Sequence, residues 1–296
     1  MKDFKIQNCP ICRSNIKSEA IIKPDIDPFK SLKIKKKLWT IFQSERIFFP
    51  YHRCQCGLLT NRIFLKEKML KHLYSDMNDN VHSGEGVQND IKTKIGYLNQ
   101  LKDILHKKKD LKFLEIGPDN GNFLRLVKKI NPKVKSIVVE PNKRMHKKLK
   151  SLTNKVYNDI KKVPKNEKFD LIVAIHVFDH VPNFLSFLKI LKNKLKKGGS
   201  IYGVVHDERS IMAKILRNRW PAYCLQHPHL FNPTTINKVF LKLKCNKRFI
   251  KKTVNFFNLG FLLKRLIMAI FKKKINFPNF FTIGLKLGNF SFLYYK

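Results

Sequence analysis

The chain has 296 residues, of which 43% are hydrophobic and 28% are charged, and this composition indicates a globular protein and excludes a disordered one. The length allows one large domain or a domain with a small appendage. The net charge is +40, but 50 of the 61 basic residues are lysine, whereas nucleic-acid sites favour arginine. We therefore interpret most of the charge as a solvated surface, with an anionic membrane, a lipid-linked substrate or RNA as alternative partners.

No targeting or membrane-spanning segment is expected. Residues 1–15 are polar and carry a cysteine pair where a signal peptide has an apolar core. The longest apolar segment, 256–271, contains Lys264 and Arg265 and is shorter than the roughly 18 residues that a spanning helix needs. The sequence therefore predicts a cytoplasmic protein, with contact to the inner face of the membrane as an alternative.

Residues 1–75 contain two close cysteine pairs, a C-x-x-C and a C-x-C, in turn-like settings. Four thiolates can hold a tetrahedral zinc ion, and disulfides are disfavoured in the cytosol. We predict that a structural zinc is bound by Cys9, Cys12, Cys54 and Cys56, with His52 as a substitute ligand. Four protein ligands leave no open position on the metal, so catalysis there is not expected.

Residues 76–90 are rich in Asn, Asp, Gly and Ser and are predicted to form a linker. The rest of the chain, 91–296, is predicted to form one α/β domain that opens with a helix. The apolar residues of this helix recur every three or four positions and are expected to share one face. They are Ile91, Ile95, Leu98, Leu101 and Leu105.

A strand, a glycine-containing turn and a helix form the centre of this domain. An apolar run ends at Glu115-Ile116, Gly117 and Gly121 enclose a turn, and a helical pattern follows from Phe123. Such a unit opens a doubly wound α/β domain, in which ligands lie at the carboxyl ends of the strands. The spacing is not the dinucleotide fingerprint, and a carboxylate at the strand end disfavours a phosphate ligand.

Further strands follow in order. Residues 134–140 are predicted to form the second strand, and its terminal Glu140 can accept hydrogen bonds from both ribose hydroxyls of a nucleoside. The alternative is a surface glutamate ahead of a helix that starts at Pro141. Residues 156–160 fit a third strand and its exit, where Asp159 is a candidate acceptor for an adenine amino group.

Residues 169–181 are predicted to be a buried fourth strand and its exit. A helix is expected from Pro182 to Lys197, with Gly198-Gly199 as its cap and 200–206 as the fifth strand. Two final strands are expected within 251–257 and 281–295. The basic amphipathic helix between them, 261–274, is interpreted as a lid or packing helix, with a membrane-surface helix as the alternative.

Residues 115–121, Glu-Ile-Gly-Pro-Asp-Asn-Gly, resemble motif I of class I S-adenosylmethionine-dependent methyltransferases, with Asp119 at the middle glycine. The run 169–181, with its exit Phe178-Asp179-His180, resembles motif IV, and Glu140 lies between the two motifs in the family's order. The resemblance implies an α/β fold with a Rossmann-like seven-stranded sheet whose last strand is antiparallel. It implies that S-adenosylmethionine is bound by Glu115, Gly117, Asp119, Gly121, Glu140, Asp159 and His176.

The N-terminal zinc module, with its Cys-Gly-Leu end and the Tyr74-Ser75 pair, is similar to the module of bacterial sugar and polysaccharide-cluster methyltransferases. Residues 207–245, with an Arg-Trp-Pro turn at 219–221, resemble the insertion that covers the substrate in those enzymes. Histidine can serve as the general base for methyl transfer to a hydroxyl. The candidates are His180, His206, His227 and His229.

We therefore expect S-adenosylmethionine-dependent methyl transfer to a small polar acceptor, a hydroxyl or carbon of a sugar or glycan precursor, free or on a carrier. One alternative is an RNA methyltransferase, favoured by the charge and by Trp220 with Arg217 and Arg219. Another is a non-catalytic scaffold with the same fold, for which Asp119 in the glycine turn is the support.

Overall fold

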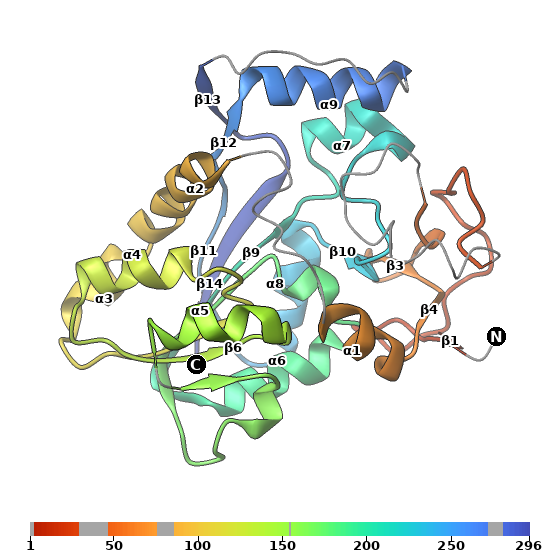
Figure 1. Cartoon of the computed structure of the whole chain (residues 1–296). Coiled ribbons are helices and arrows are strands. Elements are labelled where there is room, and N and C mark those ends of the chain that lie inside the picture. The colour runs from red at the N-terminus through yellow and green to blue at the C-terminus, as the bar shows by residue number, and fades with distance from the viewer. Residues whose placement is uncertain (1–2, 30–46, 76–85, 154, 272–280) are drawn as a thin grey trace.

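The computed structural model describes residues 3–29, 47–75, 86–153, 155–271 and 281–296. A seven-stranded sheet with the order β11-β14-β9-β8-β5-β6-β7 lies at its centre (Figure 1). Its strands are β5 (Lys112–Ile116), β6 (Lys135–Val139), β7 (Val156–Tyr157), β8 (Phe169–Ile175), β9 (Leu195–His206), β11 (Asn246–Lys252) and β14 (Asn289–Tyr295). β14 runs antiparallel to both β9 and β11, whereas β5 to β9 are parallel. The expected sheet is therefore confirmed.

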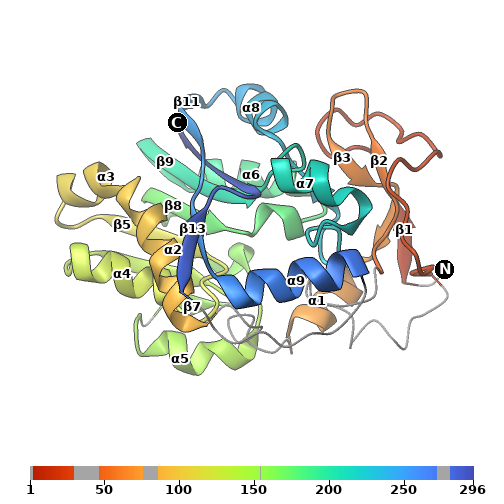
Figure 2. The same cartoon turned by 90° about the horizontal axis from the view of Figure 1, so that it is seen from above.

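Helices cover both faces of this sheet (Figures 1 and 2). One layer comprises α2 (Val87–Asn99), α3 (Lys102–Lys107), α4 (Asn122–Ile130) and α5 (His146–Lys150), and the other comprises α6 (Phe184–Asn193) and α8 (Pro233–Lys242). Neighbouring strand residues alternate between the two cores, as Phe113 and Leu114 do, because side chains of a strand point to opposite faces in turn. Short 3-10 helices are η2 (Lys143–Met145), η3 (Ile160–Lys162), η4 (Phe178–His180) and η5 (Arg217–Arg219).

The N-terminal module packs against the predicted insertion. It contains β1 (Phe4–Ile6), β2 (Tyr51–Arg53), β3 (Leu59–Asn61), β4 (Ile63–Leu65) and α1 (Glu67–Ser75). β10 (His229–Leu230), which belongs to the insertion, pairs with β3, and the insertion also carries α7 (Ile211–Leu216) and α8. One small sheet therefore joins the two segments.

The helix predicted from residue 91 differs in its extent and in its buried face. α2 begins at Val87, inside the predicted linker, and the chain bends before α3 begins. Ile95 is 41% exposed, whereas Thr93 is buried and its hydroxyl accepts the backbone N–H of Phe256. The buried face turns toward α4 and β12 (Asn255–Asn258), and this polar contact replaces part of the expected apolar stripe.

The predicted glycine cap after the helix at Pro182 is wrong. α6 ends at Asn193, and Gly198-Gly199 lie inside β9, where the pairing with β8 shifts between Phe169 and Leu171. A Cβ on Gly199 would lie 2.7 Å from the carbonyl oxygen of Phe169. The glycine pair therefore serves close strand pairing, and the strand is longer than its apolar run 200–206.

The last strands also differ from the prediction. β11 begins at Asn246, and β12 leaves the central sheet to pair with β13 (Thr282–Leu285). α9 (Leu259–Phe271) lies between them and near α7 in both views, and the remainder of the predicted basic helix falls outside the described residues. Among the described helices, none has the length and apolar content that crossing a bilayer requires.

Candidate functional site

The turn after β5 contains three left-handed residues, with φ of 64° at Gly117, 51° at Asp119 and 79° at Gly121. Glycine adopts this conformation without strain, and aspartate tolerates it better than most residues do. Asp119 at the middle position of the motif is therefore compatible with the turn. Asp119 adopts the left-handed backbone conformation of this turn although it stands where the family pattern has glycine.

Gly117 is also required for space, because a Cβ there would lie 2.8 Å from Cγ2 of Val177. We predict that Gly117→Ala destabilises the fold by about 2–3 kcal/mol, from left-handed strain plus overpacking against a stiff β-branched side chain. The matched control is Gly198→Ala, where φ is 72° but nothing lies within 4 Å, so strain alone should cost about 1 kcal/mol. Urea unfolding measures both, and equal losses would contradict the steric argument.

Glu140, directly after β6, holds the turn in place. Its Oε2 accepts the N–H of Asp119 at 3.1 Å and its Oε1 accepts the N–H of Asn142 at 2.8 Å. The side chain is buried, and desolvation raises its pKa to about 7 despite these two hydrogen bonds. A buried carboxylate at the second strand tip fits the predicted ribose acceptor.

Glu115, in β5, is the second buried carboxyl group at the carboxyl ends of the strands. Its Oε2 has no hydrogen-bond partner among the described residues, and burial raises its pKa to about 8 although Lys94 lowers it. An orphaned buried acceptor is costly, so it indicates a missing donor. The α-ammonium and hydroxyl groups of S-adenosylmethionine are such donors, and these residues fit that ligand.

Asp159, the predicted adenine acceptor, lies at the end of β7. Its Oδ1 accepts the N–H of Lys161 and caps η3, and its Oδ2 is 4.0 Å from Nζ of Lys71. The carboxylate is thus already engaged by its own turn. Its adenine role stays a prediction.

Four histidines gather where β8 and β9 end, beside the glycine turn. His176 follows β8, His180 lies in η4, His206 ends β9 and His227 belongs to the insertion. Ring centroids are 4.7 Å apart for His176 and His206, and 4.9 Å for His206 and His227. Because Val177, next to His176, contacts Gly117, this cluster adjoins the predicted cofactor turn.

Asp179 is fully buried and contacts the imidazole of His206. Its Oδ2 lies 2.5 Å from Nδ1 of His206 and accepts the backbone N–H of the same residue at 3.0 Å. Desolvation lowers the pKa of His176 to about 3 and that of His227 to about 4, so these rings are neutral at pH 7. Neutral imidazole can accept a proton or bind a metal ion.

The N-terminal module places His180 and His227. The hydroxyl of Tyr74 is 2.9 Å from Nδ1 of His180, whose Nε2 is 3.3 Å from Nε2 of His227. The Tyr51 hydroxyl donates to the carbonyl oxygen of His227, and the Arg53 guanidinium bonds the Glu208 carboxylate at 2.7 and 2.9 Å. These partners were not predicted, because sequence spacing does not show contacts between segments over 100 residues apart.

His229 differs from the other base candidates. Its Nδ1 is 2.7 Å from the Thr60 hydroxyl and its Nε2 is 2.6 Å from the carbonyl oxygen of Pro182. The side chain is fully buried. Both of its ring nitrogens have these protein partners, so neither is directed at the cluster formed by His176, His180, His206 and His227. This geometry favours a structural role for His229.

The four predicted zinc ligands meet in the N-terminal module. Sγ of Cys9 is 3.5 Å from Sγ of Cys56, Sγ of Cys12 is 3.3 Å from Sγ of Cys54, and all four sulfurs lie within 4.8 Å of one another. A tetrahedron of Zn–S bonds of ~2.3 Å separates its sulfurs by roughly 3.8 Å, so these thiols fit a zinc ion. His52 lies apart from them, with Nδ1 2.8 Å from the carbonyl oxygen of Glu19.

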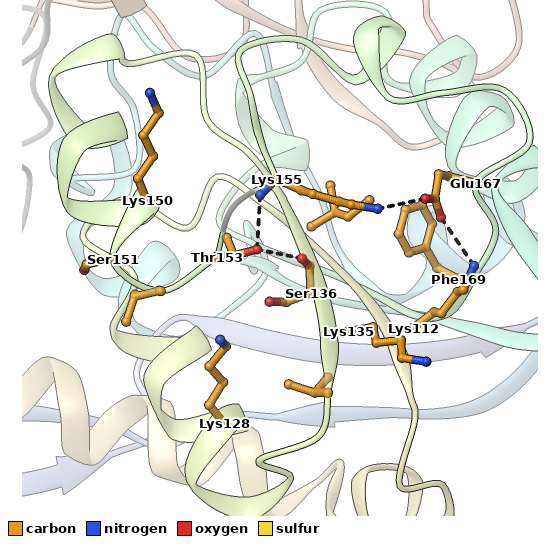
Figure 3. A pocket seen from close by; sticks show the side chains of 13 residues that line it. Lys112, Lys128, Lys135, Ser136, Lys150, Ser151, Thr153, Lys155, Glu167 and Phe169 are labelled. Carbon is orange, nitrogen blue, oxygen red and sulfur yellow. Dashed lines mark hydrogen bonds and ion pairs between the residues drawn. The ribbon is translucent and has the colours of Figure 1, made fainter.

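A surface cavity of about 600 Å³ lies at the opposite, amino-terminal ends of the strands (Figure 3). Its labelled lysines include Lys112 and Lys135, which begin β5 and β6. Ligands of open α/β sheets bind at the carboxyl ends, where the glycine turn and the histidines lie. We therefore do not assign the cofactor to this cavity.

Comparisons with known proteins identify the family. A protein-family model described as a methyltransferase domain matches residues 88–246, more than half of the chain. An uncharacterized protein of Methanocaldococcus jannaschii is 30% identical over 112 residues, which are 38% of this chain and about half, 48%, of that relative.

Among solved structures, an S-adenosylmethionine-dependent methyltransferase of Archaeoglobus fulgidus is 19% identical, with a TM-score of 0.46 over 71% of this chain and 97% of that one. A magnesium protoporphyrin IX methyltransferase of Synechocystis is 9% identical, with a TM-score of 0.49 over 77% and 93%. Through the match over residues 88–246, the chain belongs to the methyltransferase-domain family, which confirms its resemblance to class I S-adenosylmethionine-dependent methyltransferases.

Proposed function

We propose that the protein transfers the methyl group of S-adenosylmethionine to a small polar acceptor. The observation that carries the proposal is the pair of buried carboxyl groups, Glu115 and Glu140, beside the turn whose residues have positive φ. The chain belongs to the methyltransferase-domain family, in which such a turn is expected to bind the cofactor. Glu140 would bind the ribose hydroxyls, and Glu115 would bind the ammonium group of the amino-acid part. The turn 117–121 would bring the backbone close to the ligand.

When bound, S-adenosylmethionine supplies an electrophilic methyl group on a sulfonium. The protein must then align the acceptor with that methyl and exclude water, because in-line displacement depends mainly on positioning. The imidazoles of His180, His206 and His227 lie next to the cofactor turn and are the groups that would receive the proton of an acceptor hydroxyl. All three histidines are the candidate general bases that the sequence predicts.

A sugar or glycan-precursor hydroxyl or carbon, free or carrier-linked, is the proposed acceptor. The N-terminal module and the insertion support it, since Tyr51 and Tyr74 contact His227 and His180, and Arg53 bonds Glu208 of the insertion. We also propose that a structural zinc binds the four cysteines. The cytoplasmic location and the peripheral membrane contact stay predictions from the sequence.

The proposal is tested by incubating the zinc-loaded protein with S-adenosylmethionine and a panel of nucleotide sugars, lipid-linked sugars and RNA. We expect S-adenosylhomocysteine and a product heavier by one methylene in a sugar arm, detected by mass spectrometry. Methylation in the RNA arm alone would replace the sugar proposal by the RNA alternative. A folded protein that binds no S-adenosylmethionine would leave the scaffold alternative.

Cofactor affinity should rise with pH. The folded-state pKa values of Glu140, about 7, and Glu115, about 8, lie above the usual 4.5, so Glu140 is half ionised near pH 7 and Glu115 near pH 8. Since the carboxylates are the stronger acceptors, we expect roughly tenfold tighter binding between about pH 6 and about pH 8.5 in calorimetric titrations. Glu115 faces Lys94, Asp90 and Glu140, and none of these contacts reverses the sign.

The ligand-free protein should show the opposite trend. Raised pKa values mean that the folded state holds more protons than the unfolded state above about pH 4.5, so these two groups make the free energy of unfolding fall as pH rises from about 4.5 to about 8. Denaturant unfolding across this range measures the fall, and Glu140→Gln should remove the part that lies between about pH 4.5 and about pH 7. An affinity that is flat with pH would contradict the assignment of both carboxylates.

A further inference from the structure

The histidine cluster has a polar core whose hydrogen bonds are incomplete. Nδ1 of His176 and Oδ1 of Asp179 are buried and have no hydrogen-bond partner among the described residues. Asp179 is 0% exposed, and its Oδ2 contacts the ring and accepts the backbone N–H of His206. Buried acceptors without donors are costly, so their persistence indicates a group that binds them.

A metal ion fits these atoms. One ligand atom from each of His176, Asp179 and His206 lies within 4.8 Å of the others. Two imidazole nitrogens and one carboxylate oxygen are a common ligand set for divalent first-row ions, with further coordination positions left open. Bonds of roughly 2.1 Å place neighbouring ligand atoms about 3.0–3.4 Å apart, so small side-chain shifts would complete the site.

The backbone places the three ligands together. His176 follows β8 in a left-handed conformation, with φ of 51°, and its N–H donates to the carbonyl oxygen of Val204 in β9. His206 ends β9, and Asp179 lies in η4 with its Oδ2 2.5 Å from Nδ1 of His206. A left-handed histidine is strained, and strain of this kind is found where a side chain must be aimed at a functional group.

We propose that His176, Asp179 and His206 bind a divalent transition-metal ion that holds the acceptor hydroxyl, at a site separate from the four cysteines. Its role in methylation rests on the proposed function, whereas metal binding itself does not. The acceptor oxygen would occupy an open position on the ion, which lowers the pKa of the bound hydroxyl. The O–H bond breaks and its proton passes to the imidazole of His227, whose ring centroid lies 4.9 Å from that of His206, because His206 itself is then occupied by the ion. The oxygen then forms a bond to the methyl carbon as the C–S bond breaks, and the electron pair stays on sulfur.

The test uses the full chain with zinc on its cysteines. Cobalt(II) chloride is titrated in and followed by calorimetry and by the visible spectrum. We expect one further equivalent of Co²⁺, with a spectrum that lacks the thiolate-to-cobalt charge-transfer band of a cysteine site. His206→Asn should weaken this binding at least about 100-fold, because an amide can still donate to Asp179 as Nδ1–H does but is a poor ligand for the ion. His106→Asn, at an exposed position on α3, is the matched control and should bind as the wild type does.

If the protein with zinc on its cysteines binds no further Co²⁺ or Zn²⁺ at millimolar concentration, the proposal is overturned. The same holds if His206→Asn binds Co²⁺ as tightly as the wild type. Failure of the two proposals is distinguishable, because S-adenosylmethionine affinity is measured with and without the second ion. If the cofactor binds and methylation proceeds equally well without that ion, its role in holding the acceptor is excluded.

Discussion

Replacing Glu140 by alanine is expected to weaken S-adenosylmethionine binding at least about 100-fold. Hydrogen bonds to a charged group contribute about 1.5–3 kcal/mol each, and two ribose hydroxyls would lose their acceptor together. The substitution also leaves the N–H groups of Asp119 and Asn142 without their carboxylate, so the turn itself loosens. Calorimetric titration of S-adenosylmethionine into each protein gives the affinity.

Glu167→Ala is the matched control for this experiment. Glu167 is also a glutamate of the sheet domain, but it pairs with Lys112 and Lys155 beside the cavity at the amino ends of the strands (Figure 3). Its loss should leave the affinity within about twofold, because Glu167 lies at the amino ends of the strands, away from the glycine turn. A Glu140→Ala protein that binds within tenfold of wild type would contradict the ribose assignment.

The parts of the fold that were predicted correctly depend on local chemistry. β5, β6 and β8 are apolar runs next to polar residues that mark their carboxyl ends, and such runs can be recognised from the sequence alone. Gly198-Gly199 was misassigned, since a glycine pair after a helical pattern is typical of a cap. Its actual requirement, the close carbonyl of Phe169, comes from a neighbouring strand and leaves no local pattern.

In the candidate site too, local features could be predicted from the sequence, whereas contacts between distant segments could not. Glu115, Glu140 and the turn could be named from the sequence because they follow strands directly. Asp179 was visible in the motif, but its burial under His206 could not be read from spacing. Tyr51 and Tyr74 reach the histidines from the N-terminal module, which the pairing of β10 with β3 joins to the insertion.

The largest loss of stability is expected when the proposed zinc ion is removed from the cysteine cluster, because structural zinc contributes apparent binding energies of about 10–16 kcal/mol in small modules. A Cys9→Ser, Cys54→Ser protein should have little zinc and should unfold its N-terminal module, which amide hydrogen exchange would show in β2 and β3. α8 should lose protection as well, since Lys238 and Lys242 donate to the carbonyl oxygens of Cys56 and Ile11.

This damage should separate cofactor binding from methyl transfer. The turn, Glu115 and Glu140 lie outside the module, so S-adenosylmethionine affinity should change by less than about tenfold. Methyl transfer should fall below detection, because Tyr51 and Tyr74 would no longer hold His227 and His180. Cys224→Ser, Cys245→Ser is the control: both thiols are buried but lie outside the cluster, so zinc content should stay at the wild-type level. Methylation that persists in the zinc-free protein would show that the module does not build the acceptor side.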